Sequence, residues 1–247
     1  MVVKPIKTGV VKNADLSLSD FLDKYLDSVS ERSVFAITSK VVAICEKRIV
    51  PVANTPKKKL IKREADLYTE EVFSYGSIFT VTNNTFIRSA GIDESNGNGN
   101  YVLWPIDPQA SANNIRSYLK QRFKLKSVGV IITDSSSTPL RRGTSGIYLA
   151  HSGFAALKDY RGSKDLFGRT YEMSRSNVAS GLAAAAVVAM GEGTETTPIC
   201  IIEDVPFVQF QDRDPNRAEI MDLNISIDQD IFAPFLTSVD WKKGKRS

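Results

Sequence analysis

Carboxylate and hydroxyl side chains stand in three separate stretches of the sequence and could together bind a divalent cation. Asp93 lies in a stretch rich in Gly, Asn and Ser, and Asp134 with Ser135 directly follows an apolar run. Glu192 follows an alanine-rich segment. Oxygen atoms of this kind are the ligands that magnesium and manganese prefer, and these ions bind nucleotide phosphates. Taken singly, each acid is more typical of a turn than of a metal site, so spacing alone is weak evidence for a metal site.

Four arginines, Arg141, Arg142, Arg161 and Arg169, fall in the glycine-punctuated region 139–169. Arginine binds carboxylate and phosphate through paired hydrogen bonds, which favours anionic substrates. Surface ion pairs with Asp159, Asp165 and Glu172 explain the same arginines equally well.

Several familiar sites are missing from the sequence. It contains neither a Gly-x-x-x-x-Gly-Lys-Ser/Thr phosphate loop nor a Gly-x-Gly-x-x-Gly turn, and no Cys/His set at zinc spacing. The single histidine, His151, follows an apolar run and is expected to be structural. Cys45 and Cys200 sit in apolar segments and are expected to be reduced core residues of a cytoplasmic protein. Ser-His and Cys-His nucleophilic catalysis is therefore disfavoured.

Composition indicates an ordinary soluble globular protein, with 247 residues, 42% hydrophobic and 24% charged. No apolar run approaches the roughly 20 residues of a membrane-spanning helix, and the first residues do not read as a secretory signal. Basic clusters at 57–63 and in the tail at 241–247 raise nucleic-acid binding as an option. Since no aromatic residues interleave with them, we favour a solvated helix start and a frayed tail.

The elements that must position these residues are read from hydrophobic spacing. Helices are expected at 16–30 with Ser17 or Ser19 as the cap, at 57–75 as an exposed helix, at 111–123 capped by Ser111, and at 174–190 with Gly191 as the stop. Strands are expected at 33–37, 77–87 as a hairpin turning at Asn83-Asn84, 128–132, 143–149 and 199–202.

The expected helices and strands do not alternate strictly, which predicts an α+β (mixed α/β) fold. The chain is expected to form one unit of 247 residues. If it divides into two subdomains, the loop at 91–100 is where the boundary is expected.

Six segments in order along the chain resemble one known family. The segments are Ser89–Asn96 (Ser-Ala-Gly-Ile-Asp-Glu-Ser-Asn), Ile106–Ala112, Ile131–Ser135 (Ile-Ile-Thr-Asp-Ser), Asp159–Gly162, Asp165–Arg169 and Met190–Glu192. Together they are similar to the γ-glutamyl ligases of the coenzyme F420 pathway, over about residues 5–205.

The resemblance implies a mixed α/β fold in an intertwined homodimer and a reaction that uses GTP and two divalent ions, Mg²⁺ or Mn²⁺. It implies metal ligands at Asp93, Asp134, Ser135 and Glu192. It implies nucleotide contacts at Thr8, Gly9, Val10, Val11, Ser39, Lys40 and Asn96.

The implied partners are L-glutamate, GTP and a carboxylate-bearing cofactor precursor, with no nucleic acid and no membrane. The terminal phosphoryl group would activate the acceptor carboxylate as an acyl phosphate, which the glutamate amine then attacks. Asp134, Lys40 and Arg142 are the residues expected to carry catalysis, with Lys40 neutralising phosphate charge and the arginines holding substrates.

Two places depart from the family pattern. Ala43 and Ile44 stand where a second Ser-Lys pair is common, and Thr138 replaces an arginine. These changes leave open the same chemistry on another acceptor such as a folate, ATP in place of GTP, or a non-catalytic nucleotide- or metal-binding homologue.

Overall fold

The computed structural model describes residues 1–11 and 16–246, and these form two compact units. Unit 1 comprises residues 1–11, 16–42 and 107–216, and unit 2 comprises residues 43–106 and 217–246 among those described. The expected mixed α/β class is confirmed, since each unit combines helices with a sheet. Residues 91–100 lie inside unit 2, because the two strands that flank this stretch belong to the same unit.

Unit 1 is built on a five-stranded sheet in the order β1-β12-β2-β8-β9. The central pair β2 and β8 is parallel, and every other neighbouring pair is antiparallel. The strands are β1 (Val2–Ile6), β2 (Val34–Thr38), β8 (Gly129–Ser136), β9 (Ser145–Ser152) and β12 (Ile199–Glu203). β2 and β8 are continuous apolar runs because both of their faces are buried, as for Phe35, Ile37 and Ile131.

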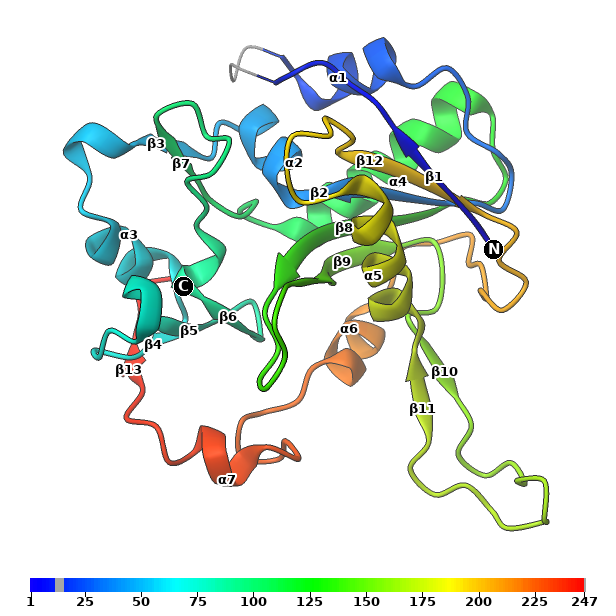
Figure 1. Cartoon of the computed structure of the whole chain (residues 1–247). Helices are drawn as coiled ribbons and strands as arrows, with labels where there is room; N and C mark the ends of the chain where they lie inside the picture. The colour runs from blue at the N-terminus through cyan, green and yellow to red at the C-terminus, as the bar shows by residue number, and fades with distance from the viewer. Residues whose placement is uncertain (12–15, 247) are drawn as a thin grey trace. The chain divides into compact units, whose positions relative to one another are not determined.

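Helices cover the two faces of this sheet (Figure 1). α5 (Val178–Met190) packs on one face, and α4 (Pro108–Phe123) with α1 (Leu18–Tyr25) lies on the other. α2 (Ser39–Cys45) follows β2 directly. A two-stranded hairpin of β10 (Leu157–Asp159) and β11 (Arg175–Asn177) extends away from the sheet.

Unit 2 contains a four-stranded antiparallel sheet in the order β13-β4-β5-β6 and a two-stranded sheet of β3 and β7. Its strands are β3 (Ile49–Pro51), β4 (Leu67–Tyr68), β5 (Phe79–Thr82), β6 (Thr85–Arg88), β7 (Asn100–Val102) and β13 (Lys242–Lys243). Its helices are α3 (Lys57–Glu64), α6 (Arg217–Leu223) and α7 (Ala233–Leu236). Leu60, Ile78 and Leu103 belong to its apolar core.

Most expected elements are confirmed within a few residues, and so are two of the local signals. Ser17 is the N-cap of α1, where its hydroxyl accepts a hydrogen bond from the Asp20 amide. Asn83 and Asn84 both have positive φ, which is the conformation that a tight two-residue hairpin turn requires.

Four helix boundaries differ from expectation. The helix expected over 16–30 ends at Tyr25, since Leu26 is extended. The helix expected over 57–75 ends at Glu64, because the Asp66 amide bonds to the Val81 carbonyl and the chain continues as β4. The cap of α4 is Asp107 rather than Ser111, since the Asp107 carboxylate accepts from the Ala110 amide. α5 begins at Val178 because the preceding residues pair with β10.

Residues 242–246 of the basic tail are hydrogen bonded to the rest of unit 2, which corrects the expectation that the tail frays. Lys242 and Lys243 pair with β4, and the Gly244 amide donates to the Asp66 carbonyl at 2.8 Å. The Arg246 guanidinium donates to the Ile106 carbonyl at 3.0 Å. Backbone pairing, which residue charge does not reveal, therefore fixes this segment.

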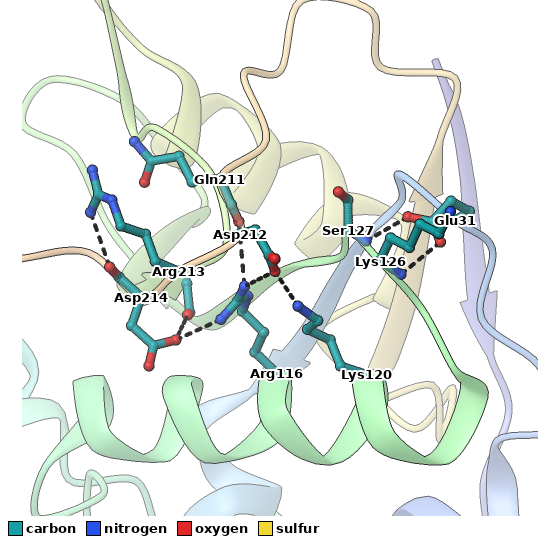
Figure 2. Close-up of polar contacts among 10 residues, drawn as sticks. Glu31, Arg116, Lys120, Lys126, Ser127, Gln211, Asp212, Arg213 and Asp214 are labelled. Carbon is teal, nitrogen blue, oxygen red and sulfur yellow. Dashed lines mark hydrogen bonds and ion pairs between the residues drawn. The ribbon is translucent and has the colours of Figure 1, made fainter.

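An ionic latch fixes the chain that leaves the central sheet after β12 (Figure 2). Arg116 on α4 is 5% exposed, and its guanidinium contacts the Asp214 carboxylate at 3.1 Å and the Asp212 carboxylate at 3.3 Å. Lys120 forms a second ion pair with Asp212, and the Ser152 hydroxyl donates to Asp214 at 2.6 Å. We call Arg116, Lys120, Ser152, Asp212 and Asp214 the latch.

Candidate functional site

The carboxyl ends of β2 and β8 bring two of the predicted segments to one edge of the unit 1 sheet. Thr38, the last residue of β2, is in parallel register with Thr133 on β8. Ser39 and Lys40 follow Thr38 at once, and Asp134 and Ser135 follow Thr133 at once. Because the two strands are adjacent and parallel, these polar residues lie at the same edge of the sheet, where α/β sheets bind ligands.

Glu192 follows the C-terminal end of α5 and reaches the same edge of the sheet. The Ser135 hydroxyl donates to the Glu192 carboxylate over 3.1 Å, so residues 57 positions apart in sequence meet directly. The Asp134 carboxylate accepts a hydrogen bond from the Ser135 amide at 2.8 Å. Of the four predicted metal ligands, the structure therefore brings Ser135 into contact with Glu192, and Asp134 is the residue that precedes Ser135 on β8.

Gly146 permits the contact between Ser135 and Glu192. It lies opposite Ser135 in the β8–β9 ladder, and a side-chain carbon at Gly146 would stand 2.5 Å from the Ala183 carbonyl oxygen. It would also stand 2.7 Å from Val187. Glycine therefore lets α5 approach β9 closely, and the end of the helix is carried toward Ser135.

The predicted N-terminal nucleotide segment joins the same edge. Thr8 lies just after β1 and is buried, and its amide donates to the Thr196 carbonyl at 2.7 Å. The Thr38 amide donates to the Pro198 carbonyl at 3.0 Å. The loop between α5 and β12 is thus hydrogen bonded to the segments that carry Thr8 and Ser39. Gly9 and Val10 are exposed and Val11 is half-buried.

Glu195 folds back under this loop. Its carboxylate accepts from the Gly193 amide at 2.8 Å, and a side-chain carbon at Gly191 would meet the Glu195 carboxyl carbon at 2.4 Å. Gly191 has φ +79°, a conformation that side chains rarely adopt. Two glycines and one acid therefore fix the backbone that carries Glu192.

The predicted catalytic residues differ in exposure. Ser39 is buried, Lys40 and Asp134 are half-buried, and Arg142 is exposed in the turn between β8 and β9. Arg142 therefore stands on the hairpin whose first strand carries Asp134 and Ser135.

Asp93 and Asn96, the remaining predicted residues, lie in unit 2. The Asp93 carboxylate accepts from the Ser95 amide at 2.9 Å and from the Ser95 hydroxyl at 2.8 Å, which is a local turn. Asn96 is exposed and has φ +56°. Asp93 therefore forms a turn with Ser95, whose hydroxyl also lies 3.0 Å from the second oxygen of the Asp93 carboxylate.

The donor set in unit 1 suits a hard cation. It consists of the Asp134 and Glu192 carboxylates and the Ser135 hydroxyl, which are oxygen ligands of the kind that Mg²⁺ and Mn²⁺ prefer. Across residues 1–11 and 16–246, no group of three or more His, Cys, Asp or Glu side chains forms a metal cluster. A cation here would therefore combine these ligands with water or phosphate oxygens, as Mg²⁺ commonly does.

The arginines of region 139–169 are in part accounted for by local ion pairs. Arg161 contacts the Asp159 carboxylate, with its Nε 2.9 Å from Oδ2, and this hydrogen bond lowers the pKa of Asp159 to about 2. Asp165 instead caps a turn, accepting from the Phe167 and Arg169 amides at 2.8 Å each. For Arg161 the surface ion-pair interpretation is therefore confirmed.

His151 and Cys200 are buried, as expected from the sequence, whereas Cys45 is only half-buried. His151 is 2% exposed and packs against the Tyr148 and Phe154 rings. Cys200 is buried and Cys45 half-buried, and burial raises the pKa of each thiol to about 11.

Gly146 and Glu195 are the positioning residues that sequence reasoning missed. A glycine inside a strand is a known sign of close backbone approach, so Gly146 carried a usable signal. Glu195 carried none, because its role depends on how the loop folds back.

Ala43 and Ile44, which replace a Ser-Lys pair common in the resembling family, are buried.

Comparison with known proteins shows the family to which the chain belongs. The F420-0:Gamma-glutamyl ligase family matches residues 5–204. The coenzyme F420:L-glutamate ligase of Methanococcus maripaludis strain C7 is 33% identical over 217 residues, covering 81% of this chain and 86% of the relative. The enzymes of the same description from Methanocaldococcus jannaschii and Archaeoglobus fulgidus are 40% and 42% identical, over 59% and 46% of each chain. The chain therefore belongs to the F420-0:gamma-glutamyl ligase family, whose members are ligases that form an amide bond.

Proposed function

We propose that this protein uses GTP and divalent metal to join L-glutamate to the carboxylate of a coenzyme F420 precursor. The observation that carries the proposal is the meeting of Ser135 and Glu192 at 3.1 Å beside the ends of β2 and β8. The family match over residues 5–204 supplies the reaction class.

Forming an amide from a carboxylate at neutral pH requires activation of that carboxylate. Transfer of the terminal phosphoryl group of GTP to the acceptor forms an acyl phosphate and releases GDP. The glutamate amine then attacks the acyl carbon, loses a proton, and expels inorganic phosphate. A divalent ion bound at this edge would supply charge neutralisation for the phosphates.

The chain's own residues would position the reactants. Asp134, Ser135 and Glu192 would hold the metal. Lys40 would neutralise phosphate charge, and Thr8 would hold the nucleotide through the N-terminal segment. Arg142, exposed in the β8–β9 turn, would bind the anionic acceptor or the incoming glutamate through paired hydrogen bonds.

We further propose that the enzyme acts in the cytoplasm as a homodimer. Homodimerisation was expected from the resemblance. Among the described residues, none of the helices is both long and apolar enough to cross a membrane.

The test is turnover with a panel of acceptors. Purified protein is incubated with L-glutamate, Mn²⁺, GTP or ATP, and either the F420 precursor or a folate, and the products are identified by mass. We expect glutamate addition to the F420 precursor with GTP and release of one phosphate per amide formed.

Each of the other outcomes would assign a different function to this protein. Glutamate added to the folate alone would assign another acceptor, as the Thr138 departure allows. Tight nucleotide binding without any product would assign a non-catalytic homologue and overturn the proposal.

A further inference from the structure

Three successive residues of the loop between α5 and β12 are bonded to three different parts of unit 1 (Figure 1). We call residues 196–198 the junction. The Thr196 carbonyl accepts a hydrogen bond from the Thr8 amide at 2.7 Å, and the Pro198 carbonyl accepts one from the Thr38 amide at 3.0 Å. The junction is therefore tied both to the N-terminal segment and to the end of β2, which are the two segments of unit 1 with predicted nucleotide contacts.

The middle residue of the junction is bonded to the end of α5. The half-buried Thr197 side chain donates its hydroxyl hydrogen to the Met190 carbonyl. Met190 is the last residue of α5, and only Gly191 separates it from Glu192. Because the last carbonyls of a helix have no amide partner within the helix, this hydroxyl fixes the backbone from which Glu192 departs.

The backbone of the junction is strained. Thr196 has φ +57°, a conformation that a β-branched residue rarely adopts. The Thr8 hydroxyl also lies 3.5 Å from the Thr196 carbonyl, so two groups of one residue hold this carbonyl in place. Strain of this kind persists only where the surrounding contacts maintain it, and it is most common at functional sites.

The proposed reaction requires the spacing that the junction sets. A metal held by Glu192 neutralises the phosphates of a nucleotide held near Thr8 and Lys40, so the carboxylate and these two segments must keep a constant separation. A displacement of about 1 Å in such a constellation is enough to slow a reaction substantially. The junction meets this requirement, since it follows Glu192 in the same loop and is bonded to both segments.

We propose that Thr197 is a positioning residue of the ligase reaction, because its hydroxyl sets the place of Glu192 relative to the nucleotide-binding segments. This inference rests on the proposed function. Thr197 acts through the Met190 carbonyl and needs no contact with metal or substrate. The alternative role for the same hydroxyl is to cap α5, which would contribute to stability alone.

The test is Thr197→Val, which keeps the branched shape of the side chain and removes the hydroxyl. We expect the Kd for Mn²⁺, read by electron paramagnetic resonance with GTP present, to rise about 10-fold. We expect kcat to fall by about the same factor in the phosphate-release assay, with the KM for L-glutamate unchanged. Thr197→Ala removes the hydroxyl without adding a methyl group and should show the same losses.

Two controls separate positioning from capping. Thr197→Ser keeps a hydroxyl and is expected to restore both the Mn²⁺ affinity and kcat. Thr237→Val removes an equivalent bond in unit 2, where the Thr237 hydroxyl donates to the Ala233 carbonyl of α7 at 2.7 Å. This control is expected to lower thermal stability slightly and to leave Mn²⁺ affinity and kcat unchanged.

Three results would overturn the inference alone, in an enzyme whose wild type binds Mn²⁺ and GTP and turns over. The first is a Thr197→Val variant with wild-type Mn²⁺ affinity and kcat. The second is an equal loss in Thr197→Ser, and the third is a raised KM for L-glutamate with kcat unchanged. A wild type that binds neither Mn²⁺ nor GTP would instead overturn the proposed function, and this inference with it.

Discussion

The latch and the candidate site are both built from carboxylates of unit 1, but they satisfy those carboxylates differently. In the latch, Asp212 and Asp214 contact the guanidinium of Arg116, and Asp212 also pairs with Lys120 (Figure 2). At the site, the Glu192 carboxylate accepts from the neutral Ser135 hydroxyl. The latch thus neutralises its acids with the protein's own cations, whereas a hydroxyl does not neutralise Glu192, which suits the metal-ligand role that we propose for it.

This difference separates stability from catalysis. Breaking a buried ion pair leaves an uncompensated charge and destabilises the fold. Removing a carboxylate that awaits a cation relieves repulsion and lowers the affinity for the cation. Mutations in the latch should therefore lower stability more than turnover, and mutations at the site should lower turnover more than stability.

The largest effect is expected for Asp134→Asn at the site. The substitution keeps the shape of the side chain and removes its charge, so we expect kcat to fall on the order of 10³-fold in the phosphate-release assay. Thermal unfolding should change little, because Asp134 lies at the polar end of β8. Asp212→Asn in the latch is the matched control, and we expect it to lower thermal stability and to leave kcat nearly unchanged. Equal turnover of the two variants would contradict the comparison.

A smaller effect is expected for Arg116→Met in the latch. Loss of the buried guanidinium removes its contacts with Asp212 and Asp214, whose carboxylates are accessible to water, and we expect the free energy of unfolding in urea to fall by about 1.5 kcal/mol. Lys120→Met, at a more exposed pair, should cost under about 1 kcal/mol.

The charge state of the latch fixes the pH at which Arg116→Met should be compared with wild type. The hydrogen bond from Lys120 lowers the pKa of Asp212, so this carboxylate is charged at neutral pH. Its stabilising contribution is present above the unfolded pKa and is lost as pH falls through the lowered folded pKa. The deficit of Arg116→Met should therefore shrink only in acid, and an unchanged deficit there would argue against the ionic role.

The smallest effect is expected for Glu195→Ala beneath the loop of Glu192. Without the bond to the Gly193 amide the loop is less fixed, and we expect Mn²⁺ affinity, read by electron paramagnetic resonance, to fall about 10-fold. Glu195→Gln keeps an acceptor oxygen for that amide and should recover most of the affinity. Equal loss in both variants would indicate that the charge of Glu195, rather than its positioning role, matters.

Local signals in the sequence were sufficient for much of the fold. The apolar runs of β2 and β8, the Asn83-Asn84 turn and the stop of α5 at Gly191 depend on neighbours in sequence, and each is confirmed. The segment 57–75 failed because its second half pairs with β5 and not with itself. The ordered tail was missed for the same reason, since its partner is β4.

The sequence by itself determined the mixed α/β class, the family, and which side chains carry suitable oxygen atoms, because residue types and local spacing are enough for these. Only the tertiary structure decided that Ser135 meets Glu192, that Gly146 lets α5 come close enough for that contact, and that Arg116 neutralises two acids almost a hundred positions away. Such contacts depend on strand register and helix packing over long separations, and no local pattern of residues encodes those distances.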